Sequence, residues 1–369
     1  MMTKKRYLIL EDGTVFEGEA FGADRGMVGE VVFTTGMSGY QEALTNPSNI
    51  GVIAVMTYPL IGNYGVNRDD SESVEFHLGA LAVREITTQP SNFRSDQDLA
   101  SYMKERNIPG ISEIDTRKLT RIIRDKGTMK GMLTEAGADA DVQTTLTVLA
   151  ASGLPTNQVE AVSTKRPYPS PGRGKRVAVV DYGMKHGILR ELNNRGCDVL
   201  VVPHDTSAED VLAWHPDGIL LSNGPGNPED VETAPEFIRG VLGKVPVFGI
   251  NLGHQLLALA CGAKTYKMTF GHHGGNHPVK DHATNRTEIT SQNHEFAVDR
   301  DSLEGTGLDV THTALNDNTV EGLAHSLHPA FSVQFNPEAS PGPEDANHLF
   351  DRFIDLMERQ NGKEQQANA

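Results

Sequence analysis

The chain has 369 residues, of which 38% are hydrophobic and 22% charged, and its formal net charge is −16. This length suggests two domains, and the composition is typical of a folded, water-soluble protein rather than a disordered or membrane-spanning chain. The strong negative charge argues against nucleic acid or an anionic membrane as a partner.

The cysteine content and the N-terminus both bear on the cellular compartment. Cys197 and Cys261 are the only cysteines, which argues against a disulfide framework and in favour of a reducing compartment. The basic N-terminal residues are followed by Asp12-Gly13 before a long apolar segment can form, so a signal peptide is not expected. We therefore expect a cytoplasmic protein.

Residues 1–151 are predicted to form a mixed α+β domain. Apolar runs predict strands, two of which form a hairpin around Glu11-Asp12-Gly13, and helical spacing of apolar residues appears later. These elements do not alternate regularly, which distinguishes the domain from a βαβ fold. The predicted strands are 7–10, 14–16, 30–33 and 52–56, and the predicted helices are 99–103 and 116–123.

The second part of the chain begins after residues 152–175, which are rich in Gly and Pro and are predicted to be a linker. Strands and helices alternate in residues 176–361, as is typical of a doubly wound, mostly parallel sheet covered by helices on both faces. The polar tail, residues 362–369, is predicted to be frayed. The predicted strands are 177–180, 199–202, 218–221, 245–250, about 288–290 and 331–334, and the predicted helices are 185–194, 208–214, 235–242 and 344–357.

One turn in this second part has the pattern of a nucleophile elbow. A buried strand ends at Ile250, a Leu/Ala-rich helix follows, and Gly249 and Gly253 flank Asn251 at the apex. Such a turn lifts one side chain above a sheet and directs backbone N–H groups at an oxyanion. It normally carries Ser or Cys at its apex. An Asn amide cannot replace them, because its nitrogen lone pair is delocalised.

Three polar clusters are predicted at the carboxyl ends of strands, where open parallel sheets bind their ligands, and a fourth, residues 291–296, lies between the last two of them in the sequence. They are residues 222–228, the elbow, residues 291–296 and residues 334–338. Any one of them could be an ordinary turn, since Gly, Asn and Pro are turn residues. Four in this order after an alternating segment indicate a single site.

Several longer motifs carry a family resemblance. They lie at residues 35–42, 57–65, 115–120, 253–258, 274–278 and 337–342. With them, the C-terminal half resembles a class I glutamine amidotransferase domain, and the whole chain is similar to the small subunits of glutamine-dependent carbamoyl phosphate synthetase. The similarity covers nearly the whole chain, and the N-terminal domain separates this family from other amidotransferases.

The resemblance implies a reaction and a partner. In the family, a Cys thiolate attacks glutamine, a His paired with a Glu transfers protons, and ammonia passes through a tunnel to a large subunit. There it meets bicarbonate and ATP, and the carbamoyl phosphate feeds pyrimidine and arginine synthesis. The resemblance therefore implies a heterodimer or a higher assembly, with ATP and Mg on the large subunit and no cofactor on this chain.

The chain departs from the family at two catalytic positions. The nucleophile position is Asn251 and the base position is Asn336, whereas the Glu position is retained as Glu338. Loss of a nucleophile or its base reduces turnover by about 10⁶-fold in subtilisin, and loss of both reduces it little further. Glutaminase activity is therefore predicted to be absent.

The two cysteines are not expected to replace the missing nucleophile. Cys261 lies about 15 Å along the helix from the apex, and both it and Cys197 are interpreted as small buried hydrophobic residues.

The remaining pocket positions follow from the resemblance alone. Glu295 stands where the family usually has Gly, so its bulk and charge are expected to weaken the binding of glutamine. Asn46 and Asn227 stand where Asp is usual, and are milder departures. The family's glutamine contacts correspond to Ser48, Gly224, Gly226, Leu252, Gln255, Asn293 and Phe296.

His272, His273 and His277 could suggest a metal site, but their spacing is not that of H-E-x-x-H and no Cys or carboxylate lies between them. We therefore predict no metal.

Two alternatives to the inactive subunit stay open. One is a working glutaminase that uses an unrecognised residue, and the other is a free-standing binding module that has lost the large subunit.

Overall fold

The computed structural model describes residues 4–367, with side chains up to residue 360, and divides the chain into two compact units, Met1–Pro155 and Thr156–Ala369. The division falls within the predicted linker, 152–175, but most of that segment is structured. It contains α5 (Gln158–Val162) and β10 (Tyr168–Ser170), which belong to the second unit. Pro169 is compatible with β10 because this strand lies at the edge of its sheet and pairs only with β12.

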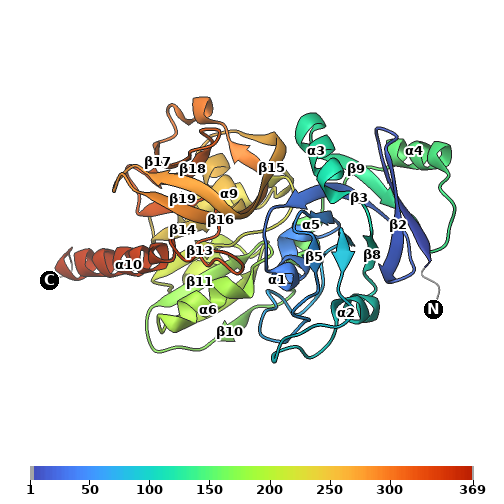
Figure 1. The fold of residues 1–369 in the computed structure, drawn as a ribbon. Helices are drawn as coiled ribbons and strands as arrows, with labels where there is room; N and C mark the ends of the chain where they lie inside the picture. The colour runs from blue at the N-terminus through green and yellow to red at the C-terminus, as the bar shows by residue number, and fades with distance from the viewer. Residues whose placement is uncertain (1–3, 368–369) are drawn as a thin grey trace. The chain divides into compact units, whose positions relative to one another are not determined.

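The first unit is built on a closed barrel with the strand order β1-β2-β8-β6-β4-β3-β9 (Figure 1). β1 and β2 form the predicted antiparallel hairpin, closed by a 2.9 Å hydrogen bond from Leu10 N to Thr14 O. β3, β4, β6 and β8 pair in parallel, so the unit is mixed, as predicted. The strands are β1 (Lys5–Leu10), β2 (Val15–Gly22), β3 (Met27–Thr34), β4 (Ile53–Met56), β6 (Ala80–Ala82), β8 (Pro109–Ser112) and β9 (Met129–Leu133).

Helices and short strands surround the barrel. The predicted helices 99–103 and 116–123 are confirmed as α2 and α3. Asp115 caps the N-terminus of α3, where its side chain accepts from Lys118 N at 2.8 Å, and the helix buries Leu119 and Ile123. The elements are α1 (Tyr40–Thr45), a 3₁₀ turn (Pro47–Asn49), β5 (Leu60–Ile61), β7 (Glu85–Ile86), α2 (Leu99–Glu105), α3 (Thr116–Lys126) and α4 (Val142–Ala151).

The second unit contains a ten-stranded sheet with the order β10-β12-β11-β13-β14-β19-β18-β16-β15-β17. Neighbouring strands in the part of the sheet formed by β12, β11, β13, β14 and β19 pair in parallel, which confirms the predicted doubly wound class. An antiparallel extension, which begins with β18, continues the sheet beyond β19. The strands are β11 (Arg176–Asp181), β12 (Asp198–Pro203), β13 (Gly218–Leu221), β14 (Val247–Ile250), β15 (Thr265–Asp281), β16 (Thr287–Val298), β17 (Leu308–Ala314), β18 (Val320–His325) and β19 (Ala330–Val333).

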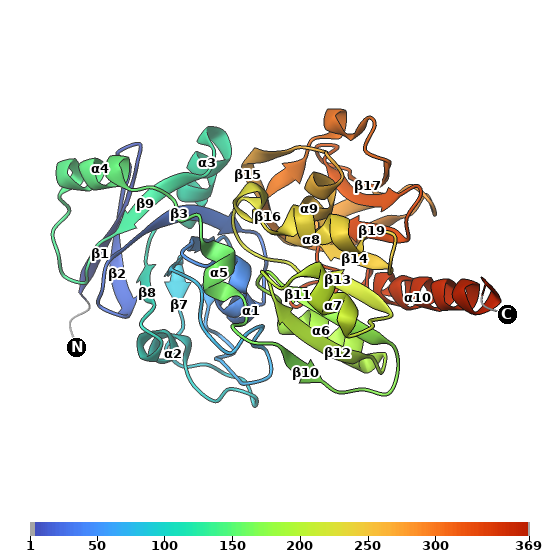
Figure 2. The ribbon, with the colours of Figure 1, turned by 180° about the vertical axis from the view of Figure 1, so that it is seen from behind.

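Helices cover both faces of the parallel part (Figures 1 and 2). On one face, α6 (His186–Asn194) and α10 (His348–Ala367) pack against alternate residues of the central strand, Val177 and Val179. On the other, Ala178 and Val180 belong to one hydrophobic cluster with residues of α7, α8 and α9, in keeping with the period of two along a strand. The last three helices are α7 (Ala208–Ala213), α8 (Ala234–Val241) and α9 (Leu252–Ala260).

The second unit differs from expectation in several places, and β17 and β18, for example, were not predicted. The long strand β15 had not been predicted, because its glycines and histidines carry no apolar alternation. α10 continues to Ala367, so the predicted frayed tail is helical up to that residue, and only 368–369 lie outside the described residues. Lys, Glu, Gln and Ala, which fill residues 363–367, are good helix formers. Among the described residues, no helix combines the length and apolar character needed to cross a membrane.

Candidate active site

The elbow is present between β14 and α9. Asn251 at its apex has φ 54° and ψ −108°, a conformation that residues other than Gly seldom adopt. A Cβ on Gly249 would lie 2.6 Å from Gly253 O, and one on Gly253 would lie 2.2 Å from Leu221 O. The turn therefore requires glycine at both positions. A 2.8 Å hydrogen bond from Asn251 N to Val333 O ties the apex to β19.

The apex side chain meets two of the other polar clusters that the sequence singled out, residues 291–296 within β16 and residues 334–338 after β19. Asn251 Nδ2 donates to Asn293 O at 3.0 Å, and it lies 3.5 Å from Asn336 Oδ1, at the limit of a hydrogen bond. Asn336 is held in place by a 2.8 Å hydrogen bond from its own N–H to Ser291 O. The structure thus places Asn251, Asn293 and Asn336 together, and both Asn251 and Asn336 are buried.

Glu338 forms a buried ion pair that the sequence did not predict. Its Oε1 lies 2.9 Å from Lys185 Nζ, and both side chains are almost completely buried. Lys185 Nζ also donates to Ala339 O at 2.6 Å, while its backbone N–H donates to Asn223 Oδ1 at 3.0 Å. Lys185 follows the carboxyl end of β11. This position, at the same sheet edge as the predicted clusters, was the signal that could have identified it.

The predicted glycine positions are places where the backbone has close neighbours. A Cβ on Gly224 would lie 2.3 Å from Tyr182 O and 2.7 Å from Leu252 Cδ2, so Gly224 and Leu252 are neighbours. Gly226 has φ 84°, which favours glycine. Ser48 belongs to the other unit, in the 3₁₀ turn Pro47–Asn49, and its part in a glutamine pocket stays a prediction.

Gln255 has a structural task within the site. It is buried on α9, and its Nε2 donates to Phe296 O at 2.7 Å and to Gln334 Oε1 at 3.0 Å. The side chain therefore holds β16 and the segment after β19 in register around the apex. Because both protons of this amide are engaged, any contact of Gln255 with a substrate would have to use its oxygen.

The other candidate nucleophiles and a nearby histidine are poorly suited to replace the missing groups. Burial raises the pKa of the Cys197 thiol and that of the Cys261 thiol to about 11, so both are protonated at neutral pH. Burial, assisted by His312, lowers the pKa of His254 to about 3, and its Nδ1 lies 2.9 Å from Ser332 Oγ. His254 is thus a weak base that faces β19.

The comparisons with known proteins agree with this architecture. Residues 8–133 match the model of the carbamoyl-phosphate synthase small chain, CPSase domain, and residues 178–356 match that of the class-I glutamine amidotransferases. The chain is 60% identical over 359 residues to the carbamoyl phosphate synthase small chain of Bacillus caldolyticus, which covers 97% of this chain and 98% of the relative. It is 61% identical over 354 residues to the pyrimidine-specific small chain of Bacillus subtilis, covering 96% of each.

The chain belongs to the family of carbamoyl phosphate synthase small chains. The two matched segments fall one in each structural unit, so the family's two domains correspond to the barrel and to the doubly wound sheet.

A histidine cluster of this amidotransferase domain lies on β15 and β16, where His294 directly follows Asn293. His272 Nδ1 lies 2.8 Å from Gln292 Oε1, and its Nε2 lies 2.8 Å from Asp317 Oδ2. His294 contacts the same Gln292 oxygen through Nε2 at 2.9 Å. Single donor atoms of His272, His294 and Glu321 lie within 4.8 Å of one another, which is close enough for a shared cation.

A proton fits this cluster better than a metal ion does. Burial lowers the pKa of His272, but hydrogen bonds to Asp317 and Glu321 outweigh it and raise that pKa to about 10. Both ring nitrogens of His272 and both of His294 are already engaged with oxygens. A cation would have to displace these partners, so the expectation that this chain needs no metal stays our prediction.

The cluster leads to a prediction about pH. We expect the free energy of unfolding to fall as the pH rises from about 6.5, the ordinary pKa of His, towards about 10, the pKa of folded His272. Below this window His272 is protonated in both the folded and the unfolded chain, and its ion pairs stabilise the fold fully. Above the window His272 is neutral in both, and this stabilisation is lost. Urea unfolding at about pH 6, 8 and 9.5 should give a slope of at most about 1.4 kcal/mol per pH unit. His272→Gln should flatten this slope, and an unchanged slope in that variant would contradict the assignment.

Proposed function

We propose that this chain is the amidotransferase subunit of a carbamoyl phosphate synthase, that it binds a large synthase chain, and that it lacks glutaminase activity. Family membership supports the first part. The pyrimidine-specific names of the relatives from Bacillus subtilis and Halalkalibacterium halodurans favour pyrimidine synthesis as the destination of the product. Arginine synthesis is the other destination that the family serves.

The observation that carries the loss of activity is the contact of two amides at the apex. Asn251 Nδ2 lies 3.5 Å from Asn336 Oδ1, at the positions where the family places its Cys nucleophile and His base. Neither amide can attack a carbonyl or accept a proton near pH 7. By analogy with subtilisin, the loss is about 10⁶-fold, or roughly 8 kcal/mol of activation free energy.

The rest of the site supports a retained architecture rather than a collapsed one. The strained apex, the glycines that flank it and the buried Lys185–Glu338 pair are all in place. The chain therefore keeps a surface and a fold that a large chain can recognise. The synthase chemistry, with ATP and Mg, is proposed to lie on that large chain, which would use free ammonia.

Glutamine binding is proposed to be weakened rather than abolished. Glu295 lies on β16, directly before Phe296, and its side chain is 18% exposed. Its carboxylate is 3.7 Å from Lys267 Nζ on β15, so part of the added negative charge is compensated. The remaining charge and bulk disfavour a ligand that carries its own carboxylate.

The test is carbamoyl phosphate synthesis by the co-purified complex with glutamine or with ammonium as the nitrogen donor. We expect turnover with ammonium and none detectable with glutamine, since the reactions on the large chain do not need the apex. Glutamine-supported turnover within about tenfold of the ammonium rate would instead favour a working glutaminase. Failure to co-purify with a large chain would favour a free-standing binding module.

A further inference from the structure

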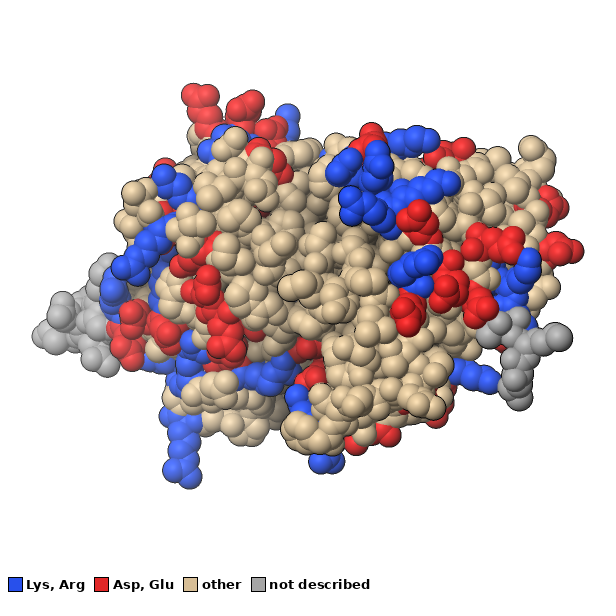
Figure 3. Space-filling model, in the orientation of Figure 1, with Lys and Arg blue, Asp and Glu red and all other residues tan. Residues whose placement is uncertain are grey.

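Positive charge is concentrated on one helix of the barrel unit. The eleven residues of α3 include five basic side chains and one acidic one, in a chain whose net charge is −16. Figure 3 shows Lys and Arg gathered on the part of the surface that α3 occupies in Figure 1. We call the side chains of Arg117, Lys118, Arg121 and Arg124 the α3 basic face.

The charges at the centre of this face have no internal partner. At its C-terminal end Lys126 pairs with Asp12 at 2.7 Å, and Arg124 pairs with Asp125 at 3.0 Å. Within the part of the chain whose side chains are described, the guanidinium groups of Arg117 and Arg121 form no ion pair and no hydrogen bond. They are one helical turn apart, where like charges destabilise a helix by about 0.2–0.5 kcal/mol. The fold therefore gains nothing from this pair by itself.

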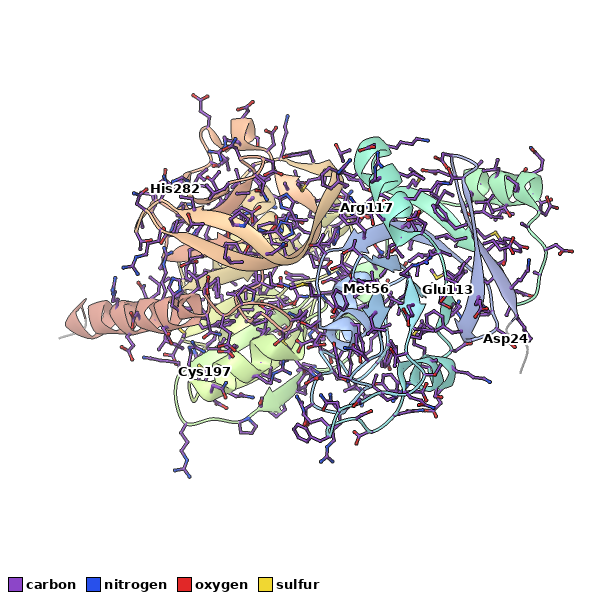
Figure 4. All side chains as sticks on the ribbon, in the orientation of Figure 1. Asp24, Met56, Glu113, Arg117, Cys197 and His282 are labelled. Carbon is purple, nitrogen blue, oxygen red and sulfur yellow. The ribbon has the colours of Figure 1, made fainter. Side chains whose placement is uncertain are left out.

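The two arginines form a ridge between two open hollows. On one side, Thr57, Arg117, Thr120, Arg121 and Arg124 line a hollow of about 390 Å³. On the other, Arg117 and Arg121 line a hollow of about 430 Å³ whose basic residues outnumber its two carboxylates. Its remaining lining residues are Asp115, Lys118, Ile122, Asp125 and Lys126. Figure 4 labels Arg117 on this helix. A ridge with a hollow on each side can receive side chains from a facing surface on both flanks.

We propose that the α3 basic face docks on a carboxylate-rich surface of the large synthase chain, an inference that rests on the proposed function. Arg is enriched at protein interfaces, and its planar fork binds carboxylates through two parallel hydrogen bonds. The rest of this acidic chain repels an acidic partner, so a local positive face determines where such a partner can approach.

The shape of the face favours a protein partner over a small anion. From Arg117 to Arg124 the charges extend about 10 Å along the helix axis, which exceeds the span of a single phosphate group. Small-molecule sites usually converge on one concave pocket, whereas here the positive groups diverge into two open hollows. The face therefore has the form of one side of an interface.

The first experiment measures the dissociation constant of the full-length chain for the purified large chain. Arg117→Glu/Arg121→Glu should raise this constant by at least about 50-fold, since both residues lie at the centre of the face. The control is Lys244→Glu/Arg286→Glu, which changes the net charge equally at two exposed residues of the other unit. The control should change the constant by less than about threefold. If charge reversal impairs folding, the neutral variant Arg117→Gln/Arg121→Gln replaces it, and we expect that variant to raise the dissociation constant by an intermediate factor.

The outcomes separate this inference from the proposed function. If the unmodified chain does not bind the large chain, both fail. If the unmodified chain binds and the α3 variant binds as tightly as the unmodified chain or the control variant, only the docking inference is overturned. An effect of the α3 variant on self-association alone, measured by sedimentation of this chain, would also overturn it. A carbodiimide crosslink from Lys118 to an Asp or Glu of the large chain, found by mass spectrometry, would support it.

Discussion

Replacing Asn251 by Cys and Asn336 by His together should raise glutamine hydrolysis by about 10⁵ to 10⁶-fold. Gly249 and Gly253 give the turn the room it needs, so we expect the apex conformation to persist when Cys replaces Asn251. The two side chains to be replaced already approach within 3.5 Å of each other, which is near the reach of a thiol–imidazole pair. The measurement is ammonia release from glutamine by the complex.

The single changes should give little. Asn251→Cys alone supplies a thiol whose unperturbed pKa is about 8.5, so most of it stays protonated at neutral pH without an imidazole partner. Asn336→His alone supplies a base with no nucleophile to activate. The pair should therefore be strongly non-additive. If either single variant provided most of the gain, the two positions would not act as a catalytic unit.

A third change separates binding from chemistry in the repaired enzyme. Adding Glu295→Gly should lower the KM for glutamine at a nearly constant kcat, because Glu295 disfavours the ground state and the transition state alike. An ordinary KM in the double variant would mean that Lys267, 3.7 Å away, neutralises Glu295. If the triple variant releases no ammonia from glutamine while ammonium still supports synthesis, the two asparagines are not the whole defect.

The parts of this site that the sequence predicted are those determined by short-range geometry. The elbow needs glycine two residues before and two residues after its apex, and this spacing can be seen in the sequence, although the atom that restricts Gly253, Leu221 O, belongs to β13. The alternation of strands and helices likewise predicted the parallel part of the sheet. With this order, the carboxyl ends of the strands had to lie at one edge, which brings Asn251 and Asn336 together.

The parts that were missed depend on contacts between distant segments. Lys185 reads as an ordinary charged residue before a helix, and only the folded chain brings it to Glu338. Barrel closure depends on pairing between strands far apart in sequence, such as β1 with β9. The hydrogen bonds from the Gln255 amide nitrogen to Phe296 and Gln334 were not predicted either, while the contact of Gln255 with a substrate stays a prediction. No local pattern carries this information.

The buried pair of Lys185 and Glu338 should have the largest effect on stability. Lys185→Met removes the ammonium group and leaves a carboxylate in a place where both side chains are nearly inaccessible to water. Breaking such a pair from one side typically costs about 3–5 kcal/mol, because the remaining charge is buried without compensation. Urea unfolding at neutral pH should show this loss. The exposed Lys4–Asp24 pair provides a matched control, and Lys4→Met should leave the denaturation midpoint nearly unchanged.

The double variant Lys185→Met/Glu338→Gln distinguishes a charge effect from a packing effect. If the loss comes from the uncompensated carboxylate, neutralising Glu338 should recover most of the stability, so the double variant should be more stable than Lys185→Met alone. If the loss comes from the packing of the Lys185 stem and its hydrogen bond to Ala339 O, the second change should add to the first. In the second case the pair would stabilise the fold by fixing the segment after β19 through packing and the bond to Ala339 O, and its charge would contribute little to stability.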